Sequence, residues 1–237
     1  MTIDHEQGTK EWLESRLGNV TASRIGDVMA KPGKKGSAES RSRANYRARL
    51  IVERLSGRAV EDEYQSYDMK RGIEIEPIAR AEYEMRENVM VETAGFVMHP
   101  TIPRFGASVD GLVGKDGLVQ FKCPKTAIHL EWLMAKRVPP EHVAQMLAEL
   151  SCRPERKWSD FVSYEPNLPH HLQLFKVRMM RDETAITEME LEVVKFNAEI
   201  DEIISKLPAP DQKDRDLTEE WQKNVDYIKA NRQKVSA

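Results

Sequence analysis

FGASVDGLVGKDGLVQFKCPKT, residues 105–126, contains two apolar segments separated by a turn that begins and ends with glycine. Residues 104–113 and 117–123 have the apolar composition of strands, and the GKDG of residues 114–117 is a hairpin turn signal. The stretch therefore predicts two neighbouring antiparallel strands joined by a tight turn.

Three polar side chains of this hairpin are expected to lie around a single point. Side chains two residues apart on a strand share a face, so Gln120 and Lys122 point the same way, and the turn brings Asp110 beside them. Mg²⁺ prefers oxygen ligands and usually takes one or two carboxylates, and a nearby lysine can position or help to deprotonate an attacking water. This combination is typical of phosphodiester hydrolysis. The alternative is a surface hairpin with scattered charges, because an aspartate followed by a lysine is a common pattern.

Strand and helix patterns alternate along the rest of the chain. Further strands are expected over 91–99, 158–165 and 172–180. Helices are expected over 9–17, from Thr21 onward, and over 40–56, 67–88, 126–136, 140–151, 183–206 and 216–232. Helices that flank a mixed central sheet of about five strands define an α/β fold, here with a C-terminal helical tail. Pro208 and Pro210 break the chain, so we expect a domain over 1–207 and a helical extension over 208–237.

The composition is that of a globular protein. With 237 residues, of which 40% are hydrophobic, the chain can bury a substantial core. No segment approaches the roughly 20 apolar residues that span a bilayer, so no membrane association is expected. Cys123 and Cys152 are the two cysteines, too few for a disulfide framework or a four-cysteine iron–sulfur cluster. A reducing, cytoplasmic location is therefore expected.

Positive charge is concentrated in one segment, although the formal net charge is −3. Residues 31–54 contain eight Lys or Arg and two Glu. Such a face can follow a phosphate backbone, and it can equally be a solvated helix surface.

Seven short segments occur in an order that resembles the YqaJ-like viral recombinase family, a branch of the PD-(D/E)xK nucleases that includes the exonuclease of bacteriophage lambda. The matching segments are W-x-x-x-R-x-G-x-V-T-A-S from Trp12 to Ser23, A-K-P at 30–32, G-x-x-x-E-x-x-A-R from Gly72 to Arg80, S-x-D-G-L from Ser108 to Leu112, x-F-K-C-P from Gln120 to Pro124, A-Q-M at 144–146 and Y-E-P at 164–166. The resemblance implies a restriction-endonuclease-like core.

The same resemblance implies an activity and its partners. Members of this kind enter a duplex DNA end, degrade the 5′-ended strand with Mg²⁺, and leave a 3′ overhang for phage recombination. Two Mg²⁺ ions are expected, with Mn²⁺ as a substitute. A homotrimeric ring around DNA and a single-strand annealing protein as partner are further implications, and the helix over 216–232 is a candidate docking segment for that partner.

Site residues are implied at the positions that match the family segments. Asp110 and the backbone carbonyl of Phe121 correspond to metal ligands and Lys122 to the catalytic lysine. Glu76 corresponds to an acid that binds a second metal or holds its water; the alternative is a solvated residue of a charged helix. The remaining implied residues are Arg16, Thr21, Ser23 and Ser108 for a terminal 5′-phosphate, Met69 for an apolar wedge between the terminal base pairs, and Gln145 near the site. A guanidinium and hydroxyls suit a phosphate, whereas Thr21 and Ser23 also suit helix caps, Met69 a core and Gln145 a surface.

Gln120 departs from the family pattern, which places a metal-binding glutamate at this position. Gln and Glu are nearly isosteric, so the fold is expected to survive while one anionic ligand is lost. We interpret Gln120 as an inactivating Glu→Gln change, deliberate rather than natural, because Asp110, Lys122 and Glu76 are all present. The alternatives are a natural, catalytically weak relative, a non-catalytic module that binds DNA ends, and an endonuclease of the same fold.

Overall fold

The computed structural model describes residues 7–33, 39–60, 67–209, 217 and 219–228. It divides into two compact units, Met1–Asp201 and Glu202–Ala237. The second unit contains the end of the long helix α8 (Glu183–Lys206) and a helical segment at 219–228, on which Trp221 and Tyr227 are exposed. The domain boundary predicted after residue 207 remains a prediction.

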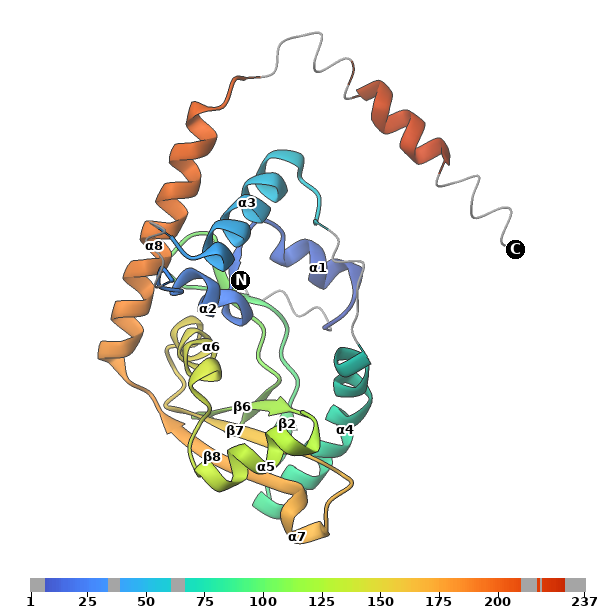
Figure 1. Cartoon of the computed structure of the whole chain (residues 1–237), viewed down its shortest axis with the longest axis vertical. Helices are drawn as coiled ribbons and strands as arrows, with labels where there is room; N and C mark the ends of the chain where they lie inside the picture. The colour runs from blue at the N-terminus through green and yellow to red at the C-terminus, as the bar shows by residue number, and fades with distance from the viewer. Residues whose placement is uncertain (1–6, 34–38, 61–66, 210–216, 218, 229–237) are drawn as a thin grey trace. The chain divides into compact units, whose positions relative to one another are not determined.

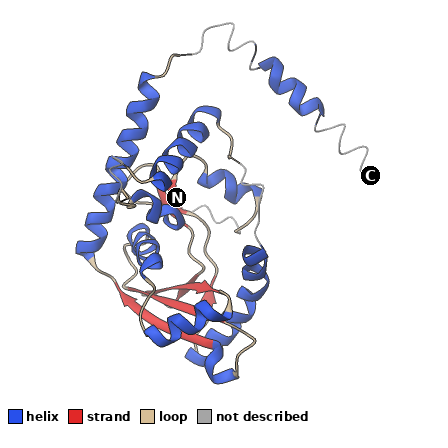
Figure 2. Cartoon of the chain, in the orientation of Figure 1, coloured by secondary structure: helices blue, strands red, loops and turns tan. Residues whose placement is uncertain are grey.

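A mixed sheet of five strands forms the centre of the first unit, as expected (Figures 1 and 2). Its order is β2 (Val91–Glu92), β5 (Gly111–Val113), β6 (Gly117–Lys122), β7 (Trp158–Tyr164) and β8 (Leu174–Met180). β6 and β7 are parallel, and the other neighbours are antiparallel. The predicted hairpin is confirmed as β5 and β6, with Val113 opposite Gly117 across the turn.

Two of the predicted strands are each divided between two sheets. Residues 91–99 form β2 and β3 (Val97–Met98), and residues 104–113 form β4 (Phe105–Ala107) and β5. β3 and β4 join β1 (Val20–Thr21) in a small second sheet. The prediction of continuous strands was wrong because the chain leaves one sheet and enters the other within each run. Gly106 permits the close approach inside the small sheet, since a Cβ there would lie 2.4 Å from the Phe96 ring.

The helices agree with the expected ranges, with three exceptions: the region after Thr21, a short helix at 170–173 that was not expected, and the helix expected over 216–232, of which the structure describes 217 and 219–228. They are α1 (Lys10–Arg16), α2 (Ile25–Val28), α3 (Arg41–Ser56), α4 (Tyr67–Glu87), α5 (Thr126–Ala135), α6 (Pro140–Cys152), α7 (His170–Gln173) and α8 (Glu183–Lys206). Thr21 ends β1 and precedes a short 3₁₀ helix, Ala22–Arg24, without a side-chain cap hydrogen bond. The helix-cap interpretation of Thr21 was therefore wrong. No helix in the described ranges is long and apolar enough to cross a membrane.

Helices α4 and α6 pack on opposite faces of β6. Val119 and Phe121 belong to the apolar cluster that includes Ala79 and Tyr83 of α4. Leu118 belongs to a different cluster, with Leu147 and Leu150 of α6. Because side chains alternate along a strand, Gln120 and Lys122 lie on the α6 side. Ile73 and Ile78 of α4 are exposed.

Candidate active site

Asp110 is attached directly to strand β6. Its Oδ2 accepts a hydrogen bond of 2.8 Å from the backbone N–H of Phe121. Arg80 of α4 donates to the backbone carbonyl of Asp110 at 2.5 Å. The following residue, Gly111, allows β2 to pass close by, since a Cβ there would lie 2.1 Å from Val91 Cγ1. The structure therefore brings Asp110 beside the strand that carries Gln120 and Lys122, as the hairpin predicts.

Gln120 is fully buried and faces a buried glutamate of α6. Its Nε2 donates to Oε1 of Glu149 at 3.2 Å, and Gln145, one helical turn earlier, donates to the same oxygen at 2.9 Å. Gln120 Oε1 and Glu149 Oε2 are buried without a hydrogen-bond partner within the described structure. Glu149 is a site residue that was not predicted from the sequence. Its spacing of four residues from Gln145 on a helix was the available signal, because such residues share a helix face.

Four ionisable side chains influence one another at this point. Burial, with a smaller contribution from the Asp110 carboxylate, raises the pKa of Glu149 to about 8 and that of Glu76 to about 7. Lys122 opposes both shifts. A cluster of acids whose pKa values are raised by burial and by one another is a frequent property of catalytic sites. The position of Glu76 beside Asp110 agrees with the one that the resemblance implies.

The pKa of Glu76 gives the metal-free protein a pH-dependent stability. The pKa rises from 4.5 to about 7 on folding, so the folded state binds more protons between these values and stability falls as the pH rises through about 7. The unchanged protein is expected to lose unfolding free energy between about pH 5 and about pH 8. Because the Glu76 side chain is only partly buried, we expect Glu76→Gln to make this loss smaller by about 1–2 kcal/mol. Urea unfolding in EDTA at about pH 5 and about pH 8 measures this difference. An unchanged difference in the variant would contradict the prediction.

Oxygen donors dominate the centre of the site. Within the described residues, no group of three or more His, Cys, Asp or Glu side chains is arranged as a metal centre. The Asp110 carboxylate, the Phe121 carbonyl and the amide oxygen of Gln120 are nevertheless donors of the kind that Mg²⁺ prefers. Gln120 Oε1 has no hydrogen-bond partner within the described residues, and neither has Glu149 Oε2, which is a further candidate because buried polar atoms are normally satisfied. The residues present therefore fit a hard divalent cation.

A cavity of about 850 Å³ adjoins this centre. Arg16, Thr21 and Ser23 line it together with Glu76 of α4. Arg16 donates to Ser23 Oγ at 3.3 Å, and the Thr21 and Ser23 hydroxyls are 3.3 Å apart. Three of the four residues predicted to bind phosphate are thus in mutual contact, and they share a cavity with one of the acids.

Ser108, the fourth residue predicted to bind phosphate, is connected to Arg16 through Trp12. The Ser108 hydroxyl accepts a hydrogen bond of 2.9 Å from Trp12 Nε1, and the Arg16 guanidinium lies 4.0 Å from the centre of the Trp12 ring. Burial lowers the pKa of Arg16 from its usual 12.5, which indicates a guanidinium that has lost part of its hydration. A partly desolvated guanidinium with neighbouring hydroxyls is well suited to an anion.

The other two predicted site residues differ in what the structure shows. Gln145 contacts Glu149, as described above, and so lies at the site rather than on a free surface. The side chain of Met69 lies outside the described residues, and its role as a wedge remains a prediction.

Cys123, which follows the site lysine in the sequence, is not a reactive thiol. Burial, together with the nearby Glu76 carboxylate, raises its pKa to about 12. A thiol with such a pKa is not ionised near neutral pH, so Cys123 is no nucleophile.

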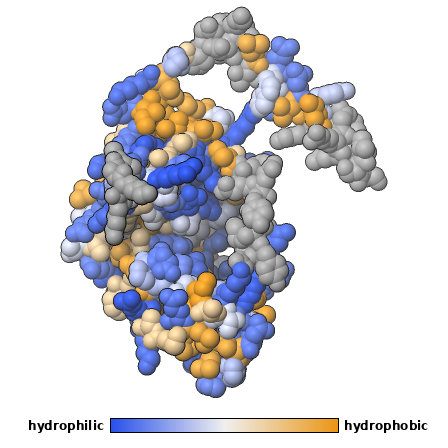
Figure 3. Space-filling view, in the orientation of Figure 1, coloured by the Kyte–Doolittle hydropathy of each residue, from blue (hydrophilic) through white to orange (hydrophobic). Residues whose placement is uncertain are grey.

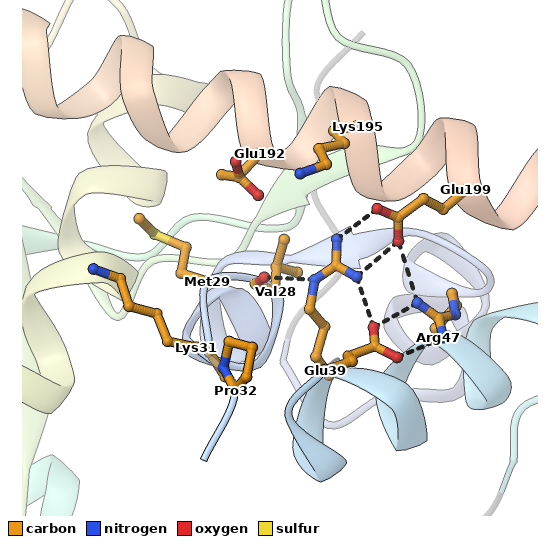
Figure 4. Close-up of a pocket in the computed structure, with 11 residues that line it drawn as sticks. Val28, Met29, Lys31, Pro32, Glu39, Arg47, Glu192, Lys195 and Glu199 are labelled. Atoms are coloured by element: carbon orange, nitrogen blue, oxygen red, sulfur yellow. Dashed lines mark hydrogen bonds and ion pairs between the residues drawn. The ribbon is translucent and has the colours of Figure 1, made fainter. Parts of the chain in front are cut away.

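Much of the basic segment is neutralised by the fold. Arg43 and Arg47 of α3 form ion pairs with Glu39 and with Glu199 of α8 beside a second cavity, of about 560 Å³ (Figure 4). Arg54 donates to Asn197 and Asp201 of the same helix. The region of α3 carries hydrophobic as well as hydrophilic residues on the face shown in Figure 3, and Val52 and Leu55 of this helix are exposed. These arginines fasten α3 to α8, so their charge is not free to follow a phosphate backbone.

Comparison with solved structures identifies the class of protein. The alkaline exonuclease LHK-Exo from Laribacter hongkongensis, solved alone and in complex with dAMP, is 44% identical, with a TM-score of 0.76 over 83% of this chain and 95% of that one. A phage-related exonuclease from Haemophilus somnus 129PT shares the fold at 14% identity, with a TM-score of 0.60 over 80% of this chain and 96% of that one. The chain is an alkaline-exonuclease-like nuclease.

The family follows from the sequence itself. Residues 11–154 match the model of the YqaJ-like viral recombinase domain, which is more than half of the chain. The chain belongs to the YqaJ-like viral recombinase family. No curated protein matches the sequence significantly.

Proposed function

We propose that the chain is a Mg²⁺-dependent exonuclease that degrades the 5′-ended strand of duplex DNA and leaves a 3′ single-stranded overhang for phage recombination. The observation that carries the proposal is the continuity of the site. Arg16, Thr21 and Ser23 line the same cavity as Glu76, and Glu76 is electrostatically coupled to Asp110 and Lys122. A group that binds a terminal phosphate and a group that cleaves a phosphodiester therefore belong to one site.

Each residue has a role that follows from its position. Asp110, the Phe121 carbonyl and Gln120 Oε1 would hold Mg²⁺, with a second ion towards Glu76. Mg²⁺ supplies Lewis-acid stabilisation of charge on the phosphate and lowers the pKa of a nearby water. Lys122 orients the attacking water. It either helps to remove a proton from this water or stabilises the negative charge that develops on its oxygen. Arg16 and the hydroxyls beside it hold the terminal 5′-phosphate and so select duplex ends.

The biological setting is part of the same proposal. A homotrimeric ring would keep the enzyme on DNA between successive cuts, a single-strand annealing protein would receive the overhang, and both would act in the cytoplasm of a bacterial host. The rival proposals are an endonuclease of the same fold and a module that binds DNA ends without cutting. Neither explains why the residues proposed to bind phosphate line the same cavity as Glu76.

Digestion of end-labelled duplex DNA tests the proposed function. We expect digestion that requires Mg²⁺ or Mn²⁺, starts at 5′-phosphorylated ends, is slower at 5′-hydroxyl ends and spares closed circular duplex. The Asp110→Asn variant is the inactive control. Nicking of closed circles would favour the endonuclease. Binding of ends without digestion, by this chain and by its Gln120→Glu variant, would favour the binding module.

The consequence of Gln120 depends on its neighbours. Gln120 removes one anionic metal ligand. If Asp110 is then the one anionic ligand left in the site, the affinity for metal falls, and on that basis we propose that digestion is impaired. Gln120→Glu is then expected to digest DNA much faster than the chain as it stands. Equal rates would show that another carboxylate compensates.

A further inference from the structure

A buried glutamate of helix α6 has no structural explanation of its own. Glu149 is 1% exposed, and one of its carboxylate oxygens, Oε2, has no hydrogen-bond partner within the described structure. A carboxylate withdrawn from water is costly unless it is paired or fully hydrogen-bonded. Contacts within the described structure therefore do not offset the free-energy cost of burying the Glu149 carboxylate.

A second buried glutamate shows what a structural role looks like in the same protein. Glu165 is also 1% exposed, yet both of its oxygens are occupied. Arg71 and Thr126 donate to one oxygen, and the backbone and side chain of Asn167 donate to the other. Glu149, by contrast, receives two neutral amide groups on Oε1 alone. Within the described residues, Glu149 has neither the ion pair nor the complete hydrogen bonding that stabilise Glu165.

The surroundings of Glu149 are those of the metal site. Its Oε1 accepts from Gln120, the residue at the position where the family pattern has a metal-binding acid. Asp110 and Lys122 both act on it electrostatically, which places all three groups in one cluster. The two amide donors hold the carboxylate by one oxygen and leave the other unoccupied on the side of the sheet that carries the site.

We propose that Glu149 supplies the anionic oxygen that Gln120 lacks, so that the acid of the metal site stands on helix α6 instead of strand β6. A site with its acid on β6 would have Glu at position 120. Here β6 carries Gln120 and α6 carries Glu149, and the two side chains are in contact. The Gln120 amide nitrogen orients the carboxylate, and Glu149 Oε2 together with Asp110 gives a divalent cation two anionic ligands, a usual number for Mg²⁺. This inference rests on the proposed metal-dependent function. If Glu149 compensates in this way, digestion is not impaired, and Gln120→Glu is expected to digest DNA at a rate similar to that of the unchanged chain.

Metal binding in the absence of DNA provides the test. We propose to measure Mn²⁺ affinity by the electron paramagnetic resonance signal of the free ion for four proteins: the unchanged chain, Glu149→Gln, Gln120→Glu, and the double variant that exchanges the two residues. Glu149→Gln is expected to lower the affinity by about 10-fold or more. The double variant restores one negative charge at nearly the same place, and we expect it to recover affinity to within a few-fold of the unchanged chain.

Controls separate a metal ligand from a residue needed for folding. Glu190→Gln on α8 removes another partly buried carboxylate, one bonded by Ser151, and is expected to leave Mn²⁺ affinity unchanged. Thermal unfolding without metal should show Glu149→Gln to be at least as stable as the unchanged chain, because it keeps the size of the side chain and removes a buried ionisable group with an unsatisfied oxygen.

Two outcomes overturn the assignment of Glu149: unchanged Mn²⁺ affinity in Glu149→Gln, or a double variant that binds as weakly as Glu149→Gln. Failure of all four proteins to digest DNA would count against the proposed function, and the Mn²⁺ series would still decide whether Glu149 binds metal.

Discussion

Replacing Lys122 by alanine is expected to lower the rate of DNA digestion by about 10²–10⁴-fold, the usual contribution of a positioned acid–base group. Lys122 is the last residue of β6, is partly buried, and acts electrostatically on both Glu76 and Glu149. Its ammonium is therefore in the same cluster as the acids that hold the cation. Single-turnover digestion of 5′-phosphorylated duplex measures the loss.

Lys115→Ala is the matched control for this experiment. Lys115 is exposed in the turn between β5 and β6. Lys115→Ala therefore removes the same charge from the same hairpin without changing the cluster of acids. We expect Lys115→Ala to digest DNA at the original rate, and Lys122→Ala to retain its affinity for DNA ends. Similar losses in the two variants would show that the general positive charge of the hairpin, and not the position of Lys122, promotes cleavage.

Replacing Arg16 by alanine is expected to reduce the preference for a 5′-phosphate over a 5′-hydroxyl by about 10- to 100-fold, because a charge-assisted hydrogen bond to phosphate contributes roughly 1.5–3 kcal/mol. Arg16 stacks on Trp12 and contacts Ser23 within the cavity that extends to Glu76. The ratio of digestion rates on the two kinds of duplex end measures the effect. Arg16→Lys should recover part of the preference, since it keeps the charge and loses the planar fork.

Arg24 provides a control within the same cavity. It also lines the cavity, but its guanidinium is held by Asp27 at 2.6 Å. Arg24→Ala is therefore expected to leave the preference for phosphate intact. An equal loss in both variants would indicate that the cavity attracts DNA by its overall charge and has no specific phosphate pocket.

The turn signal and the strand alternation predicted the positions of the site residues that lie close together in the sequence. The turn at 114–117 and the alternation of β6 placed Asp110 next to Gln120 and Lys122, and the hydrogen bond from Phe121 N–H to Asp110 is consistent with that placement. Asp110, Gln120 and Lys122 lie within 13 residues of one another in the sequence, so the geometry of one hairpin was sufficient to bring them together.

Predictions failed where a residue's environment comes from a distant segment. The run over 91–99 has the composition of one strand, but its two halves pair with different partners. The basic segment of α3 was open to two interpretations, and carboxylates of α8, more than 140 residues later in the chain, neutralise much of it. Pairing and charge neutralisation across such distances have no local signal.

The sequence by itself determined the fold class, the five-stranded mixed sheet and the family, because hydrophobic periodicity, turn chemistry and short motifs act over a few neighbouring residues. Only the tertiary structure decided that a glutamate of α6 faces Gln120, that the phosphate-binding residues share a cavity with Glu76, and that the arginines of α3 are bound to α8. The physical reason is that burial, pKa and the pairing of charges depend on which surfaces the fold brings into contact, and that contact is established only when the helices pack on the sheet.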